Sequence, residues 1–147
     1  MNIILLAATF LLLYSRIKNT PRLLNKKAYI DYTQKQYLST KETLLNLDRE
    51  ARGFTLFTGY IVLTIFAILL FVYYILVGRT VGNSLFSVLS AVQVATIISS
   101  FFHALSVDYL NPDIEKIKFH RWWFLFNIII DYIYYLGAIY VMVCNFK

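Results

Sequence analysis

The chain has 147 residues, of which 59% are hydrophobic and 15% are charged, and its mean hydropathy is +0.62. It carries a formal net charge of +6, one cysteine and five glycines, which excludes an intramolecular disulfide and leaves little material for a phosphate-binding loop. We predict an all-α fold: a small polytopic membrane protein with one integral membrane domain over residues 1–147 and about four transmembrane helices.

The first predicted span covers about residues 1–15, a stretch without charged residues. Such a helix rises about 22 Å, which is less than the roughly 30 Å of a hydrocarbon core. We therefore predict a short span, with an interfacial or half-inserted helix as the alternative. A cleaved signal peptide fits less well, because no basic residue precedes the stretch and no small-x-small site follows it.

A polar loop over residues 16–53 follows. Ser39 and Glu42 have the spacing of a capping box and precede several leucines, which predicts a short amphipathic helix on the cytoplasmic side. Basic residues near the membrane attract anionic lipid at about 1 kcal/mol each, although a solvated helix end is an equal alternative. The predicted lipid contacts are Arg22, Lys26 and Lys27. Acidic residues interrupt the basic ones, so we predict no nucleic-acid partner.

The second and third spans cover about residues 54–78 and 83–107. Charges are absent from 53–78 and from 80–107, and each stretch exceeds the roughly 20 residues that cross a bilayer as a helix. The few residues around Arg79 leave room only for a tight turn. The two spans should thus form an antiparallel hairpin.

The third span is the most polar, and its polar side chains fall on ordered faces. Small residues at every fourth position form a ladder that lets another helix approach closely; these are Ser87, Ala91, Ala95 and Ser99. A separate face carries hydrogen-bonding groups, which must meet another helix, a partner subunit or water. This face consists of Gln93, Thr96, Ser100 and His103.

The last span covers about residues 122–145 and begins with Trp122 and Trp123, which are typical of an interfacial anchor. The preceding Asn111-Pro112-Asp113 predicts a helix start that leads into this span. Asp131 is the only acid inside a hydrophobic segment. A charge at the bilayer centre costs roughly 2.5 to 3.5 kcal/mol on insertion scales, so this carboxylate needs a partner.

Counting depth at about 1.5 Å per residue along untilted helices predicts two contacts between the third and fourth spans. Asp131 should lie between the hydroxyls of Ser100 and Thr96, and His103 should lie opposite Asn127. Asp131 then serves as a hydrogen-bonded pin between helices. The alternatives are a path for protons or ions and a contact with a subunit outside this chain.

Charge sets the predicted orientation. Of the 14 Lys and Arg residues, all except Arg79 and Lys147 lie in the loop after the first span or the loop before the last. Because basic loops stay on the cytoplasmic or equivalent side, both termini should lie on the opposite side. A plasma membrane and an organelle inner membrane both fit this pattern.

The sequence carries no Walker loop, dinucleotide fingerprint, HExxH or G-x-S-x-G. We therefore predict no enzyme, no cofactor and no metal site. The leading hypothesis is a non-catalytic membrane subunit or interaction protein, with lipids and other membrane subunits as partners. The alternative is a small homo-oligomeric channel or pore, in which the polar face of the third span and Asp131 line a path for protons or ions.

Overall fold

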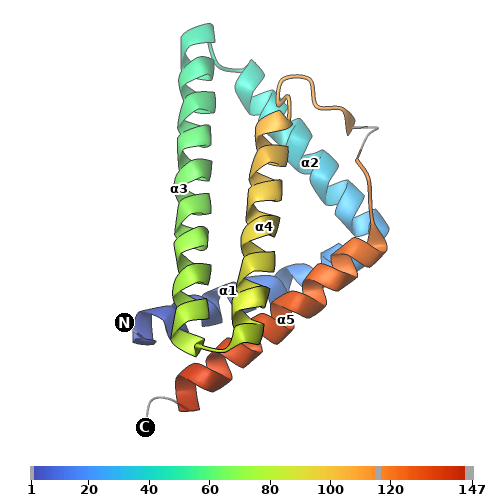
Figure 1. The fold of residues 1–147 in the computed structure, drawn as a ribbon. Helices are drawn as coiled ribbons and strands as arrows, with labels where there is room; N and C mark the ends of the chain where they lie inside the picture. The colour runs from blue at the N-terminus through green and yellow to red at the C-terminus, as the bar shows by residue number, and fades with distance from the viewer. Residues whose placement is uncertain (1, 115–116, 145–147) are drawn as a thin grey trace.

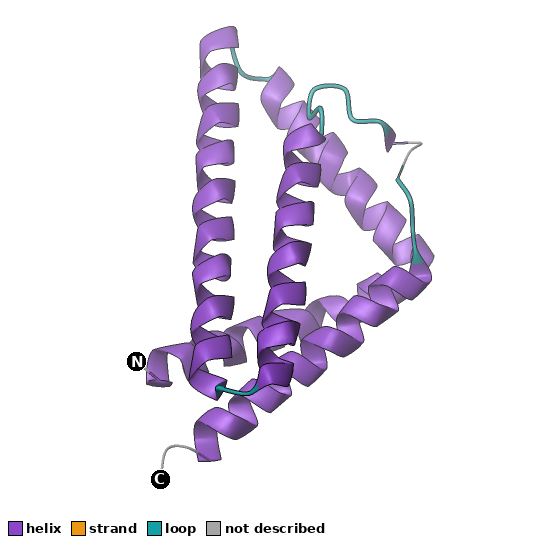
Figure 2. Cartoon of the chain, viewed as in Figure 1, coloured by secondary structure: helices purple, strands orange, loops and turns teal. Residues whose placement is uncertain are grey.

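The computed structural model describes residues 2–114 and 117–144. Its helices are α1 (Asn2–Leu24), α2 (Lys26–Leu45), α3 (Arg49–Val81), α4 (Ser84–Ser106) and α5 (Arg121–Cys144), joined by loops (Figures 1 and 2). All except α2 are long and apolar enough to cross a membrane, in agreement with the predicted all-α class and four apolar helices. Met1 and Asn145, the outer limits of two predicted spans, lie outside the described residues, as do Lys116 and Lys147.

Helix α1 is longer than the predicted span over 1–15, because it continues through its basic residues to Leu24. Arg and Lys are good helix formers. The first charged residue after an apolar stretch therefore indicates where the chain prefers water to lipid, but it does not end the helix. Pro21 lies in the last turn of α1, where the helix is about to end. The extension places Arg16 and Thr20 on the same helix as the apolar stretch.

The predicted helix start at Ser39 is wrong. Helix α2 already begins after Asn25, whose side chain accepts a hydrogen bond from the Ala28 N–H at 3.2 Å. Ser39 lies inside α2, and its carbonyl accepts a bond from Thr43 Oγ1 at 2.9 Å. No glycine or proline interrupts residues 26–45, so the chain continues as one helix through the predicted start.

The connection between α2 and α3 is closed by side chains. Asp48 caps α3, because its Oδ1 accepts a bond from the Ala51 N–H at 2.7 Å. Arg52 donates from Nε to the Leu44 carbonyl at 2.8 Å and from its guanidinium to the Leu47 carbonyl at 3.1 Å. These bonds join the start of α3 to the Leu44 carbonyl near the end of α2 and to the Leu47 carbonyl in the connection.

The predicted tight turn joins α3 to α4. Gly82 follows α3 with φ of 64°, a left-handed conformation that favours glycine, and its N–H donates to the Gly78 carbonyl at 3.2 Å. Asn83 then caps α4 by accepting a bond from the Leu85 N–H at 2.9 Å. The two helices pack side by side in opposite directions (Figure 1).

The described residues between Val107 and His120 show only a 3-10 turn at Ile114 where a helix from Pro112 is predicted, and residues 115–116, in the middle of that prediction, lie outside the described residues. Asp108 Oδ1 accepts bonds from the N–H groups of Leu110 and Asn111, at 3.0 and 3.2 Å. The Ile114 N–H donates to the Pro112 carbonyl at 3.0 Å, which forms only a tight turn. The Asp108 side chain thus forms a local turn before the predicted start, and α5 begins only at Arg121.

The four apolar helices form two pairs, α3 with α4 and α1 with α5. In Figure 1 the α1–α5 pair runs obliquely to the α3–α4 pair, and α2 forms the third side of a triangle. The pairs meet near the α3–α4 turn, which we call the closed end. Its buried apolar core contains Leu5, Leu13, Tyr73, Tyr74, Val77, Phe86, Tyr134, Tyr135, Ala138 and Met142.

Away from the closed end, most of the apolar surface is exposed. Helix α3 alone exposes large side chains on successive turns, among them Phe54, Phe57, Ile61, Ile65 and Leu69. Soluble monomers rarely expose contiguous apolar surface on this scale. Together with the helix lengths, this surface suggests a membrane-embedded protein.

Candidate functional site: a buried ion pair and an open polar cavity

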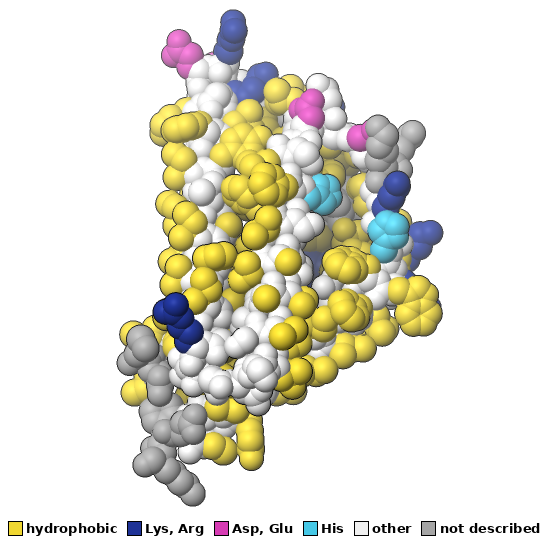
Figure 3. Space-filling model, in the orientation of Figure 1, with side chains coloured by type: hydrophobic (Ala, Val, Ile, Leu, Met, Phe, Trp, Pro, Cys, Tyr) yellow, Lys and Arg dark blue, Asp and Glu magenta, His cyan; other side chains and the backbone are white. Residues whose placement is uncertain are grey.

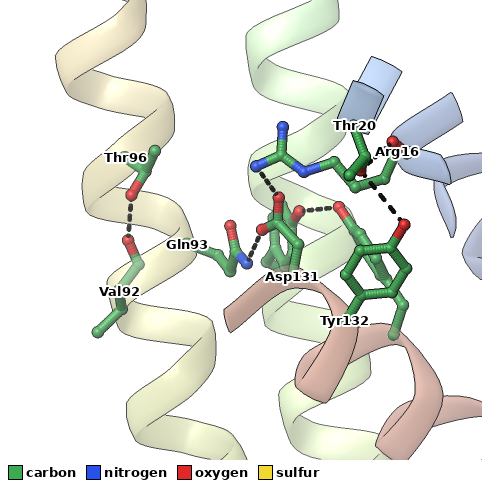
Figure 4. Close-up of polar contacts among 9 residues, drawn as sticks. Arg16, Thr20, Val92, Gln93, Thr96, Asp131 and Tyr132 are labelled. Atoms are coloured by element: carbon green, nitrogen blue, oxygen red, sulfur yellow. Dashed lines mark hydrogen bonds and ion pairs between the residues drawn. The ribbon is translucent and has the colours of Figure 1, made fainter. Parts of the chain in front are cut away.

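The carboxylate of Asp131 is held from two sides by other helices. Arg16 of α1 forms an ion pair with Asp131 Oδ2, and Gln93 of α4 donates from its amide nitrogen to Asp131 Oδ1. Both side chains point toward the carboxylate in Figure 4. Asp131 is only 9% exposed. A buried acid thus has both a countercharge and a hydrogen bond, as burial of a charge requires.

The predicted partners of Asp131 are wrong. Thr96 Oγ1 donates back to the Val92 carbonyl of its own helix at 3.0 Å, away from the carboxylate (Figure 4). Ser100 is exposed on α4. The depth count assumes upright neighbouring helices, whereas α5 crosses α4 obliquely (Figure 1). The level of Asp131 therefore matches Gln93, about one turn closer to the α3–α4 turn.

The other predicted contact, between His103 and Asn127, and the predicted small-residue ladder both lie apart from this ion pair. His103 is exposed and Asn127 is half-buried, and no hydrogen bond joins them within residues 2–114 and 117–144. The ladder of Ser87, Ala91, Ala95 and Ser99 is exposed along its whole length. Close packing of that ladder within the chain is consequently not the source of the fold's stability.

Arg16 is predicted from the sequence to be a basic loop residue. In the structure it belongs to α1 and pairs with Asp131. Its Nε is buried without a hydrogen-bond partner among the described residues. One turn further on, Thr20 Oγ1 lies 3.2 Å from the hydroxyl of Tyr132. The signal available in the sequence is that Arg16 is the first cation after an apolar run too short to span hydrocarbon on its own.

Tyrosine hydroxyls extend the polar contacts into the closed end. Tyr74 and Tyr135 lie 2.6 Å apart, oxygen to oxygen. The Tyr134 hydroxyl lies 3.0 Å from Ser90 Oγ, and the Tyr73 hydroxyl lies 2.7 Å from Thr9 Oγ1. These bonds link α1, α3, α4 and α5 through groups that would otherwise be unsatisfied in an apolar environment.

The predicted lipid contacts and anchors differ in their surroundings. Arg22 bonds to Asn19 and lies over the ring of Tyr32, with 3.5 Å between the guanidinium carbon and the ring centroid. Lys26 and Lys27 are exposed at the start of α2. Trp122 and Trp123 are 81% and 55% exposed. Arg22 is thus already occupied by contacts within the chain, whereas the two lysines and two tryptophans are accessible.

A cavity of about 770 Å³ lies between α2, α4, the described parts of the 107–120 loop (residues 107–114 and 117–120) and the start of α5. We call this region the open end. Ser99, Ser100 and His103 of α4 line it, together with Lys118, His120 and Trp123. The polar face of α4 is therefore divided: Gln93 reaches Asp131 inside the protein, while Ser100 and His103 border a cavity. In Figure 3 the two histidine side chains, in cyan, flank a hollow.

No group of three or more His, Cys, Asp or Glu side chains within residues 2–114 and 117–144 is arranged to hold a metal ion. Comparison with known protein families, curated proteins and solved structures finds no match.

Proposed function

We propose that the protein is a non-catalytic integral membrane protein that packs against transmembrane helices of other subunits in a larger membrane complex. The observation that carries this proposal is the enclosure of Asp131 by Arg16 and Gln93. Asp131 is the group of the predicted spans whose burial in lipid would cost the most free energy. Its carboxylate is satisfied within the chain, so it serves to fix α1, α4 and α5 together. The outward faces remain apolar and uncovered.

The surface proposed for docking is the ladder Ser87, Ala91, Ala95 and Ser99 on α4. Its side chains are small and exposed. A groove of about 310 Å³ lies beside it, lined in part by Gly78, Ser87 and Ala91. Small residues allow two helix backbones to approach closely in a membrane, where packing replaces the hydrophobic effect as the driving force. The proposed occupant is a transmembrane helix of another membrane protein.

The proposed placement follows the charge pattern. The basic residues of α2, its flanking segments and the 107–120 loop lie on the cytoplasmic or equivalent side, with α2 at that membrane surface and both termini on the opposite side. The face that α2 turns inward mixes Ile30, Tyr37 and Leu44 with polar Thr33 and Gln34. Any amphipathic role of α2 at the surface accordingly rests on its exposed lysines more than on an apolar stripe.

The competing hypothesis is a homo-oligomeric pore for protons or ions. It requires Gln93 and Asp131 to face a shared lumen. Both side chains are buried against other helices of the same chain, which favours the subunit proposal.

Purification from the native membrane in mild detergent, followed by mass measurement and identification of co-purifying proteins, tests the proposal. We expect a stoichiometric set of other proteins, which Ala91→Phe and Ala95→Phe should release. Val62→Phe on α3 is the matched control, because Val62 is 60% exposed and does not line the groove beside the ladder. A homogeneous multiple of the 17.2 kDa chain, without foreign proteins, would instead support the pore.

A further inference from the structure

The cavity of the open end has the size and lining of a ligand site. Its volume of about 770 Å³ falls within the roughly 300 to 1,000 Å³ of small-molecule pockets. Polar groups converge on it from three parts of the chain: Ser100 and His103 from α4, Asp108 and Lys118 from the loop, and Thr33 from α2.

Among the residues that the structure describes, the charges that border the cavity are of both signs. Lys118 supplies a cation, and His103 and His120 supply imidazoles that can donate N–H bonds. Asp108 and Asp113 supply carboxylates. The carboxylate of Asp108 is fixed in place, because its Oδ1 accepts the backbone N–H groups of Leu110 and Asn111. A simple anion would meet repulsion from Asp108, and a simple cation would meet repulsion from Lys118. The matching ligand carries both charges.

The cavity also has an apolar wall at the predicted membrane boundary. Trp123 and Phe124 line it at the start of α5, where the sequence places the interfacial anchors. A ligand there has access both to the polar loop and to the exposed apolar surface that faces lipid. We infer that this cavity binds the headgroup of a zwitterionic phospholipid, with the ammonium at Asp108 and the phosphate at Lys118 and the imidazoles.

Two kinds of ammonium satisfy this chemistry. A primary ammonium, as in phosphatidylethanolamine, donates hydrogen bonds to carboxylate and hydroxyl oxygens. A quaternary ammonium, as in phosphatidylcholine, has no N–H and depends on aromatic faces such as that of Trp123. The inference covers both, and it stands independently of the proposed membrane complex.

Native mass spectrometry of the full chain tests it, after delipidation and exchange into detergent with equal amounts of phosphatidylethanolamine, phosphatidylcholine and phosphatidylglycerol. We expect one retained phospholipid per chain, with at least a tenfold preference for a zwitterionic lipid over phosphatidylglycerol. Preference between the two zwitterionic lipids then identifies the ammonium. Asp108→Asn keeps an oxygen for the Leu110 and Asn111 N–H groups but removes the charge, so it should abolish that preference.

Lys118→Gln should lower retention of all three phospholipids by about tenfold, because each carries the phosphate. Asp31→Asn and Lys35→Gln on α2 are the matched controls; both residues are exposed and neither lines the cavity, so retention should equal that of the unchanged protein. Preferential retention of phosphatidylglycerol, the absence of a retained lipid, or equal effects of Asp31→Asn and Asp108→Asn would each overturn the inference.

Discussion

The closed and open ends of this molecule treat polar groups in opposite ways. At the closed end and just beyond it, Asp131 and the buried tyrosines find their partners within the chain. At the open end, His103 and Ser100 face a cavity. The difference shows that polar residues on one helix face can have separate roles: those near the helix crossing hold the fold together, and those beyond it remain accessible to a ligand, water or a partner.

Breaking the ion pair should have the largest effect. Asp131→Asn leaves the half-buried Arg16 without its countercharge, and removal of one member of a buried pair costs up to about 3 to 5 kcal/mol of unfolding free energy. Denaturation by SDS in mixed micelles, followed by circular dichroism, measures this loss. Asp31→Asn, which changes an exposed acid on α2, should change stability by less than about 0.5 kcal/mol.

The double variant Arg16→Met with Asp131→Asn sharpens that result. Because it removes both charges, it should recover much of the stability lost in either single variant. Additive losses would show that the two residues do not interact. Ion flux should also be measured on this double variant. Asp131→Asn alone could lower flux either because it removes an ion path or because it destabilises the fold.

Crowding the helix crossing should have the next largest effect. A Cβ added at Gly137 of α5 would lie 2.5 Å from Cζ of Phe86, a buried ring of α4. Gly137→Ala should therefore destabilise the protein by about 1 to 3 kcal/mol, as overpacking does. At Gly59 of α3 nothing lies within 4 Å of the added carbon. Gly59→Ala should be neutral or raise stability by up to about 1 kcal/mol, and a loss equal to that of Gly137→Ala would contradict the packing described for the closed end.

Removing a single hydroxyl compares the two ends directly. Tyr135→Phe deletes the bond to Tyr74 and leaves that hydroxyl without its 2.6 Å partner, so it should cost about 1 kcal/mol. Ser100→Ala at the open end removes a hydroxyl that borders the cavity and should leave stability unchanged. The same denaturation assay measures both, and equal losses would mean that the open end is also held by its polar groups.

Local patterns predict the presence of the four apolar helices and the position of the α3–α4 turn. The uncharged stretches identify the apolar helices, and the residues around Gly82 identify the turn. The relative placement of the helices is not predicted, because periodicity along one helix contains no information about the angle at which another crosses it. Assigning Gln93 and Arg16 to Asp131 requires the oblique α1–α5 pair, which only the tertiary structure supplies.

The limits of helices are also poorly predicted where charge is taken as their boundary. Arg16 looks like a loop residue because it follows an apolar run, yet it continues α1 and reaches into the protein. Ser39 and Pro112 look like helix starts because their neighbours fit capping patterns. In the structure, Asn25 already begins α2, and Asp108 binds the backbone of the residues that precede Pro112. A capping pattern in the sequence therefore does not by itself determine where a helix begins, because other local hydrogen bonds can form in its place.

Titration of two tyrosines outside the predicted spans should have the smallest effect. Burial raises the pKa of Tyr37 on α2 and of Tyr109 in the 107–120 loop above the ordinary 10.0, and neighbouring tyrosines, Tyr29 for Tyr37 and Tyr37 for Tyr109, raise it further. The folded state therefore favours the neutral phenols. Their contribution to stability is fully present below about pH 10 and is lost as the pH rises through the folded pKa values. Stability measured from pH 8 to 11 should decline at the upper end, and the double variant Tyr37→Phe with Tyr109→Phe, which keeps both rings, should decline less. An identical decline in the two proteins would show that other groups cause the loss of stability at high pH, and that the tyrosines of the open end do not contribute to it.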